Sequence, residues 1–408
     1  MTKRQAAVNI IKRLRSGGHQ ALLAGGCVRD MLLGRTAKDF DVATDAQPAE
    51  VMKLFRRTLN VGAKFGVVIV LLEGRQVEVA TFRTETDYAD GRHPAKVEFV
   101  GAAEDAKRRD FTINGMFYDP LGREVIDYVS GQADLNSRIV RTIGAPQERF
   151  GEDYLRMLRA VRFATQLGFE IEAQTMSAIC SNASKITGIS GERIAMELEG
   201  ILVHPDRAKG AKLLFETGLA GAIFPGLAGE QQKAAIGVPG QLRKKVDFPL
   251  ALTAFFAACP NEFALEKCRV LKLSRNQTRH IKFLLTNRTR LLDEQMSLAR
   301  LKMLLAEPYF RDLYELQRAI QKFTGGREAV APLIALRRRI KALGDVELKP
   351  KPLLSGHDLI RLGAVAGPRL GQLAEEMYIA QLEGNLQTVT EAKQWVQDWL
   401  QKRKAFEE

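Results

Sequence analysis

The sequence lacks any long hydrophobic run and contains few cysteines. No apolar stretch approaches the roughly 18–20 residues that a membrane-spanning helix needs. The charged first residues are not followed by the apolar segment of a signal peptide, so we expect a soluble, cytoplasmic protein. The four cysteines are scattered, without a CxxC pair or a histidine at metal-ligand spacing: Cys27, Cys180, Cys259 and Cys268. This spacing argues against a zinc site or a disulfide framework and predicts reduced, mostly buried thiols.

Acidic residues are outnumbered. The chain has 48 aspartates and glutamates against 61 lysines and arginines, which leaves a net charge of +13. An excess of this size favours a polyanionic partner such as RNA or DNA. Basic clusters recur along the whole length, at 107–109, 156–162, 275–290 and 337–339, although the last also fits a solvated helix face. With 408 residues, 46% of them apolar, the chain can form two to four domains.

Strand patterns are confined to the first third of the chain. Residues 67–72 and 76–82 are rich in β-branched side chains, and the turn at Gly74 predicts a hairpin with Glu78 on its polar face. From about residue 140 the apolar residues recur at helical spacing, beginning with 152–167. Breaks rich in proline and glycine, near 225–240 and 349–356, predict subdomain boundaries. We expect an α/β head with a small mixed antiparallel sheet, followed by an all-helical remainder in an elongated chain.

The most informative motif is a glycine pair followed by two carboxylates. Gly25-Gly26 interrupts an apolar run, and Asp39 and Asp41 follow in a segment that we predict to be extended. Side chains at i and i+2 of a strand lie on the same face, so the two carboxylates are expected to project together. Such a pair is stable where a cation lies between its members, and the glycines can present backbone N–H groups to an anion. The motif predicts a metal ion and a phosphate group at one site.

A third carboxylate, Glu78, completes this predicted site. It lies on the polar face of the second hairpin strand, and an antiparallel sheet can bring it beside Asp39 and Asp41. We expect all three to be catalytic, with Asp39 and Asp41 as ligands of two Mg²⁺ ions. Ions held in this way activate an attacking hydroxyl and neutralise a leaving pyrophosphate.

Longer motifs run through nearly the whole chain. In order they read GGCVRD, KDFDVATDA, GAKFGVVIV, VEVATFR, RRDFTIN, GEDYLRMLRAVRFATQLGF, ISGERIAMELEGIL, ETGLAGAIFPGL and GHDLIRLGAVAGPRLG. Together they resemble the class II tRNA nucleotidyltransferase and bacterial poly(A) polymerase family. The resemblance implies a nucleotidyltransferase head at 1–137 and a helical nucleobase-recognition neck at 138–203. It also implies a helical body at 204–330 and a tail at 331–408 that bind the acceptor and T arms of tRNA.

The resemblance also implies roles for single residues. Gly25, Gly26 and Arg29 are expected to bind the triphosphate, although Arg29 can instead form an ion pair with Asp30. Asp110 is expected to sense the ribose 2′-hydroxyl, with helix capping as the alternative. Supporting roles fall to Arg109, Asn114, Glu152, Arg159 and Arg162.

In the same family pattern, Asp153 and Arg156 read the nucleobase. They are three residues apart in a predicted helix and would lie side by side, so an ordinary ion pair is the alternative. As a template, the Asp accepts from the exocyclic amino group of cytosine or adenine while the Arg donates to the neighbouring ring nitrogen. Uracil and guanine reverse this polarity and leave charged groups unpaired, at a cost of a few kcal/mol.

A loop rich in glycine, proline and charge, at 86–94, separates the head motifs. It resembles the flexible loop that enzymes adding only CC lack, and Asp90 and Arg92 match its pattern. His357-Asp358 does not suffice for a metal-dependent phosphohydrolase, and His280 has no partner that indicates a ligand role.

The leading prediction is addition of CCA to tRNA 3′ ends from CTP and ATP, with Mg²⁺ and without an obligate protein partner. Poly(A) polymerase is the nearest alternative, but Gly66 and its surroundings are similar to CCA-adding members. An enzyme that adds only A remains open, because one sequence does not reveal a companion enzyme. An inactive RNA-binding protein is disfavoured by the intact Asp39, Asp41 and Glu78.

Overall fold

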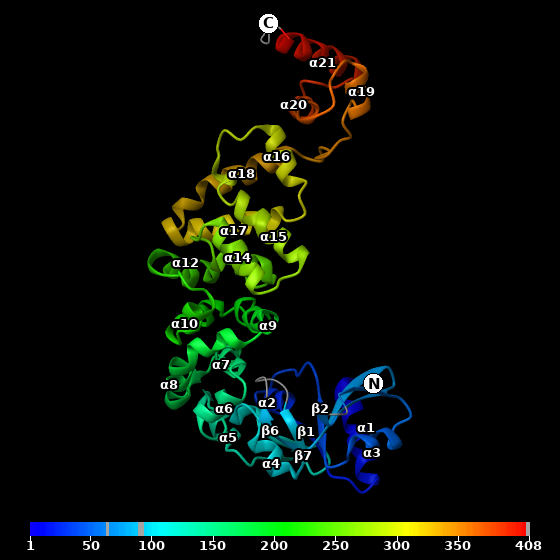
Figure 1. The fold of residues 1–408 in the computed structure, drawn as a ribbon, viewed down its shortest axis with the longest axis vertical. Coiled ribbons are helices and arrows are strands. Elements are labelled where there is room, and N and C mark those ends of the chain that lie inside the picture. The colour runs from blue at the N-terminus through cyan, green and yellow to red at the C-terminus, as the bar shows by residue number, and fades with distance from the viewer. Residues whose placement is uncertain (63–64, 89–93, 405–408) are drawn as a thin grey trace. The chain divides into compact units, whose positions relative to one another are not determined.

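A computed structural model describes residues 1–62, 65–88 and 94–404. The chain forms two compact units, which are described separately (Figure 1). The first comprises residues 1–240 and 266–273, and the second comprises 241–265 and 274–408. The predicted class is confirmed, because a mixed sheet with helices is followed by an all-helical remainder. The finer division into head, neck, body and tail stays a prediction.

A seven-stranded sheet with the order β3-β4-β5-β2-β1-β8-β9 forms the N-terminal part of the first unit. Strands β2 and β5 pair in parallel, and the other neighbours are antiparallel. Its strands are β1 (Ala21–Ala24), β2 (Asp41–Thr44), β3 (Thr58–Gly62), β4 (Val67–Leu72), β5 (Arg75–Thr81), β8 (Phe117–Asp119) and β9 (Glu124–Ile126). Separate two-stranded sheets join β6 (Arg83–Tyr88) to β7 (Pro94–Phe99) and β10 (Ile139–Val140) to β11 (Glu170–Ile171).

Helix α1 (Lys3–Ser16) covers one face of the sheet. Its buried residues recur every three or four positions, as an amphipathic helix requires: Ala6, Ala7, Ile10, Ile11 and Leu14. The helix packs against β1, β2 and β5, and all of β1 is buried. Two short helices, α2 (Gly26–Leu32) and α3 (Pro48–Leu54), follow β1 and β2.

The predicted hairpin is confirmed. Strands β4 and β5 pair antiparallel with Ile69 opposite Glu78. Glu73 and Gly74 both have positive φ, 46° and 74°, the conformation that matches the twist of a tight hairpin. Val77 and Val79 are buried while Glu78 is exposed, so the strand alternates as its sequence predicts.

Helices make up the rest of the first unit. The predicted helix at 152–167 is two helices, α6 (Pro146–Glu152) and α7 (Leu155–Leu167), and α7 ends at Gly168 in the left-handed conformation. Residues 229–240, within the segment where we predicted a subdomain boundary, form α12 (Gly229–Gly240), which tolerates Pro239 in its last turn, and the boundary between the two units follows directly after this helix. The others are α4 (Ala102–Lys107), α5 (Gly131–Ser137), α8 (Ala173–Asn182), α9 (Gly191–Leu202), α10 (Arg207–Glu216) and α11 (Leu219–Ile223).

Among its described residues, the second unit contains helices and no strands. Its helices are α13 (Phe248–Phe255), α15 (Arg275–Asn287), α16 (Leu298–Leu305), α17 (Phe310–Gly325), α18 (Ala331–Ala342), α19 (Gly356–Arg361), α20 (Pro368–Glu383) and α21 (Val389–Lys404), and α14 (Asn261–Val270) contributes residues to both units. Helices α19 to α21 enclose a small core of their own that includes Leu359, Leu373 and Val396. Across the described residues, no helix is long and apolar enough to span a membrane.

The cysteines are free, as predicted. Cys27, Cys259 and Cys268 are buried, and this burial raises the pKa of each thiol to about 11. Cys180 is exposed. At neutral pH the buried thiols are protonated and unreactive.

Candidate active site

Most of the predicted site residues line one cleft of about 550 Å³ in the first unit. The cleft brings together Gly25, Gly26, Arg29, Asp41, Glu78, Arg109, Asp110, Asn114, Asp153, Arg156, Arg159 and Arg162. These residues come from strands β2 and β5, from the turn after β1 and helix α2, from the segment 109–114, and from the segment 153–162 that includes the first part of α7. Residues separated by more than a hundred positions in the sequence therefore share one site.

The glycine pair forms the turn from β1 into α2. Gly25 has a φ of 72°, and a Cβ added there would lie 3.2 Å from Nη1 of Arg109. This left-handed backbone conformation and this close approach both favour glycine. At this turn, therefore, no side chain covers the backbone where it borders the cleft.

Asp41 and Glu78 come from neighbouring strands. Asp41 begins β2, and the pairing of Val42 with Val79 places it level with Glu78 on β5. Loss of solvation around the carboxyl group, followed by repulsion from Glu78 and Asp39, raises the pKa of Asp41 from 3.8 to about 6. A divalent cation would remove this repulsion, and carboxylate oxygens are the ligands that Mg²⁺ prefers. The donor set at this edge of the sheet thus fits such an ion.

Asp39 does not lie where the sequence predicted. Strand β2 begins at Asp41, so Asp39 precedes it and the two side chains are not an i, i+2 pair of one strand. Asp39 is not among the residues that line the cleft. Its carboxylate accepts a hydrogen bond from Nζ of Lys3 at 2.6 Å, and 73% of its side chain is exposed. Asp39 remains near enough to contribute to the raised pKa of Asp41.

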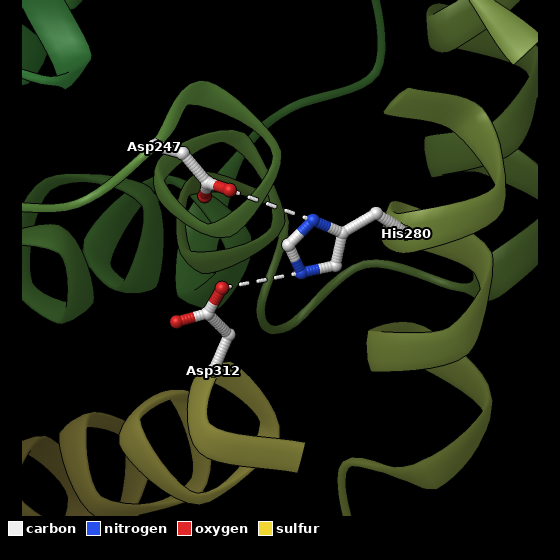
Figure 2. A group of neighbouring side chains, drawn as sticks. All are labelled: Asp247, His280 and Asp312. Carbon is white, nitrogen blue, oxygen red and sulfur yellow. Dashed lines mark ion pairs between the residues drawn. The ribbon is translucent and has the colours of Figure 1, made fainter. Parts of the chain in front are cut away.

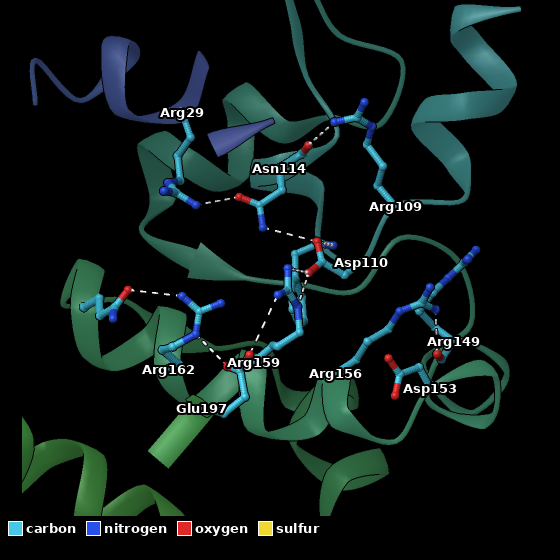
Figure 3. Close-up of polar contacts among 12 residues, drawn as sticks. Arg29, Arg109, Asp110, Asn114, Arg149, Asp153, Arg156, Arg159, Arg162 and Glu197 are labelled. Atoms are coloured by element: carbon cyan, nitrogen blue, oxygen red, sulfur yellow. Dashed lines mark hydrogen bonds and ion pairs between the residues drawn. The ribbon is translucent and has the colours of Figure 1, made fainter. Parts of the chain in front are cut away.

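A chain of hydrogen bonds runs through the cleft from Arg29 to Arg159 (Figure 3). Nη1 of Arg29 donates to Oδ1 of Asn114 at 2.6 Å, and Nδ2 of Asn114 donates to Oδ1 of Asp110 at 3.2 Å. Nε and Nη2 of Arg159 donate to Oδ2 of Asp110 at 2.8 and 2.6 Å. Although burial opposes ionisation, the charge and hydrogen bonds of Arg159 lower the pKa of Asp110 to about 2. The alternative predicted for Arg29 is also present, because it pairs with Asp30 at 2.8 Å.

Asp153 and Arg156 line the same cleft but are not on one helix. Asp153 lies between α6 and α7 with φ −153°, and its Oδ1 accepts from the backbone N–H of Leu155 at 3.0 Å. Its Oδ2 accepts from Nη2 of Arg193 at 2.6 Å. Arg156 donates instead to Glu152, and to the carbonyl of Arg149 at 2.8 Å. The predicted pair is thus assembled from a capping residue and a helical residue, each with a partner of its own.

Sequence reasoning missed the residues that hold this site together. Two of them lie on α9. Arg193 forms an ion pair with Asp153, and Glu197 forms one with Arg162, each at 2.6 Å. Asp105, 1% exposed, binds Arg109 at 2.9 Å. The motif ISGERIAMELEGIL contains two of them, but its spacing does not show which distant side chains they meet. The loop residues Asp90 and Arg92 lie outside the described residues.

A separate cluster lies in the second unit, where His280 sits between two carboxylates (Figure 2). Nδ1 of His280 faces Asp247 at 3.5 Å and Nε2 faces Asp312 at 3.4 Å. The ring stacks on Tyr309 with 4.1 Å between centroids, and Arg243 lies 2.6 Å from Asp312. We predicted that His280 has no partner that indicates a ligand role, but the structure places two carboxylates beside it. Each ring nitrogen faces its own carboxylate, and one ligand atom from each of the three residues lies within 4.8 Å of the others.

Two family models match the chain. Residues 21–141 match the model described as "Poly A polymerase head domain". Residues 168–230 match the one described as "Probable RNA and SrmB- binding site of polymerase A". The first match contains the glycine turn, Asp41, Glu78 and Asp110.

Curated relatives and solved structures agree on a narrower family. The CCA-adding enzyme of Geobacillus kaustophilus is 48% identical over 229 residues, so the chain spans about 56% of the length of that relative. The CCA-adding enzyme of Lactobacillus gasseri is 36% identical over 394 residues, 93% of each chain. The crystal structure of the Bacillus stearothermophilus CCA-adding enzyme in complex with CTP is 31% identical, covers 99% of both chains and has a TM-score of 0.82. With this cleft and these matches, the chain belongs to the family of CCA-adding enzymes.

Proposed function

We propose that this protein is a template-independent RNA nucleotidyltransferase that adds C, C and A from CTP and ATP to tRNA 3′ ends. In each step the primer 3′-hydroxyl attacks the α-phosphate of the nucleotide, and pyrophosphate leaves. One observation carries the proposal. A single cleft holds the Asp41–Glu78 carboxylates and the Asp153 and Arg156 side chains, in a chain of the CCA-adding family.

Asp41, with Glu78 and Asp39, would hold divalent cations, and we propose that these are two Mg²⁺ ions. When bound, such ions lower the pKa of an attacking hydroxyl and neutralise the negative charge of a triphosphate. For Asp39 to contribute, its carboxylate must exchange its ion pair with Lys3, an exposed contact of the kind that is worth little energy.

The neighbouring groups would bind the rest of the nucleotide. The backbone at Gly25-Gly26 and the guanidinium of Arg29 would bind the triphosphate, since N–H groups and arginine are preferred phosphate partners. Asp110 would accept a hydrogen bond from the ribose 2′-hydroxyl and so favour ribonucleotides over deoxyribonucleotides. Both assignments place their residues on the walls of the cleft that contains Asp41.

Asp153 and Arg156 would select the base. The carboxylate accepts from the amino group of cytosine or adenine, and the guanidinium donates to the adjacent ring nitrogen. The N–H and carbonyl of uracil or guanine present the reverse pattern. The partners Arg193 and Glu152 fix the two side chains before any base arrives, which lowers the entropy cost of recognition.

The primer would be a tRNA held by the basic helical part of the chain. A net charge of +13 supports binding to RNA phosphates. Contacts to phosphates and to the overall shape of the acceptor and T arms suit a fixed RNA fold better than base-by-base reading. An enzyme with this substrate is expected in the cytoplasm.

The test uses three primers: tRNA truncated before CCA, tRNA ending in CC, and oligo(A). Each is incubated with Mg²⁺ and either with each nucleotide separately or with CTP and ATP together. We expect C, C and A on the first primer and A on the second. Addition of A to the second primer with none on the first identifies an A-adding enzyme. Long tails on oligo(A) identify a poly(A) polymerase, to which the matched head model also refers.

The effect of Mg²⁺ on thermal stability is expected to depend on pH. Because folding raises the pKa of Asp41 to about 6, this group favours the folded state below pH 4, and that contribution is lost as the pH rises through 6. Bound protons also compete with metal for the carboxylate. Mg²⁺ should therefore raise the unfolding temperature more at pH 7.5 than at pH 5, as differential scanning fluorimetry can measure.

Two variants control this measurement. Asp41→Asn should lose most of the Mg²⁺-induced shift at pH 7.5, whereas Asp345→Asn, which changes an exposed carboxylate of the second unit, should keep it. A shift of equal size at both pH values, or one that survives in Asp41→Asn, would show that the ion binds elsewhere.

A further inference from the structure

The carboxylate of Asp110 has no spare acceptor position in the structure. Oδ1 accepts from the backbone N–H of Phe111 at 2.9 Å and from Asn114 at 3.2 Å. Oδ2 accepts twice from Arg159, at 2.8 and 2.6 Å. An ionised carboxylate offers about four lone-pair sites, and all of them are used. A ribose hydroxyl can donate to Asp110 only if one of these donors moves away.

Of these donors, Arg159 is the one with an alternative acceptor nearby. Its Nη1 lies 3.9 Å from Oε1 of Glu197, on the side opposite Asp110 (Figure 3). Oε2 of Glu197 is taken by Nε of Arg162 at 2.6 Å, and within the described part of the chain Oε1 accepts no hydrogen bond. By contrast, Phe111 donates through its backbone, and Asn114 is tied to Arg29.

Glu197 offers Arg159 a second, buried carboxylate. Glu197 is 8% exposed, so its charge acts in a poorly screened environment. Arg159 also lies over the ring of Phe163, with its guanidinium carbon 5.3 Å from the ring centroid. Moving from one carboxylate to the other keeps the arginine ion-paired, while Asp110 keeps its hydrogen bonds from Phe111 and Asn114 and gains one from the ribose hydroxyl.

We propose that Glu197 is a positioning residue that takes over Arg159 when the ribose 2′-hydroxyl of the incoming nucleotide binds Asp110. This inference rests on the proposed function, in which Asp110 contacts the ribose. A nucleotide without the 2′-hydroxyl gives Asp110 no replacement donor, so the exchange does not occur. Glu197 therefore contributes to the selection of ribonucleotides without touching the substrate.

The test compares kcat/KM for ATP and for 2′-deoxyATP, with tRNA ending in CC, in the wild type and in Glu197→Gln. A neutral amide offers one acceptor oxygen to two guanidinium groups and attracts Arg159 weakly. We expect kcat/KM for ATP to fall about tenfold, the loss of one hydrogen bond to a charged group, while the value for 2′-deoxyATP changes less than about twofold. Equal losses for both nucleotides would show a merely structural role and overturn the inference.

Four points separate a specific effect of Glu197 from a general loss of structure or activity. The kcat/KM values for the two nucleotides are measured on one sample, so a smaller folded fraction lowers both equally and does not change their ratio. Glu199→Gln, an exposed position on the same helix, should retain the wild-type ratio. If Glu197→Gln does not fold, Glu197→Asp keeps the charge and withdraws it by one methylene, and should give an intermediate ratio. A wild type that adds no A to the CC-ended primer contradicts the proposed function itself, before any variant is compared.

Discussion

Asp41→Asn is expected to lower the rate of both C and A addition by at least about 10³-fold, or roughly 4 kcal/mol in the activation free energy. Asparagine keeps the size and shape of the side chain but removes the charge. Asp41 lines the cleft beside Glu78, and the repulsion between them is the physical reason for a cation there. Without that charge, neither the attacking hydroxyl nor the pyrophosphate is stabilised.

Single-turnover addition to truncated tRNA measures this effect separately for CTP and ATP. Asp45→Asn is the matched control, since Asp45 follows the same strand but contacts His19 at the surface, 3.5 Å away. Its rate should stay within about twofold of the wild type, because exposed pairs contribute little. Circular dichroism would show that both variants are folded. If Asp41→Asn retained a tenth of the wild-type rate, the reactive centre would have to be placed elsewhere.

The parts of this site that the sequence predicted are those set by local rules. A hairpin with Gly74 in its turn fixes which face Glu78 occupies, and the glycine pair marks a backbone that turns sharply. The carboxylates Asp41 and Glu78 were expected together for this reason. We expected antiparallel pairing to bring them together, but β2 pairs with β5 in parallel, a direction that the alternation within each strand does not specify.

The wrong predictions arise where a regular strand or helix was assumed to continue beyond the residue at which it begins or ends. The i, i+2 rule placed Asp39 beside Asp41, but β2 begins only at Asp41. The helical spacing of apolar residues at 152–167 predicted one helix, whereas the structure has a break between α6 and α7. A signal for that break was present, because aspartate is a preferred residue just before a helix, and Asp153 accepts from the N–H of Leu155.

The partners of the site residues could not be predicted from spacing. Glu197 meets Arg162 across 35 residues, and Arg193 meets Asp153 across 40. Such pairs depend on how α9 packs on α7, which is decided by burial of apolar faces rather than by the charged residues themselves. A motif shows that these residues belong to a helix, and the structure shows which carboxylate or guanidinium each one holds.

Asp153→Asn is expected to weaken base selection more than it weakens catalysis. The carboxylate can only accept hydrogen bonds, so it matches the amino group of cytosine or adenine and repels the carbonyl of uracil or guanine. An asparagine amide can also donate, and it can rotate to satisfy either pattern. Discrimination against UTP and GTP should therefore fall about 10²-fold, the size of a few kcal/mol of lost mismatch penalty.

The measurement is kcat/KM for all four nucleotides on one tRNA primer, reported as ratios to CTP. Glu148→Gln changes an exposed position on α6, one turn before Glu152, and should leave the ratios unchanged. Asp153→Asn also removes the ion pair with Arg193, so some loss of stability and of total rate is expected. A general loss of that kind lowers all four values together and leaves their ratios intact. Only a change in the ratios shows that Asp153 reads the base, and their persistence would mean that selection of C and A resides in other residues of the cleft.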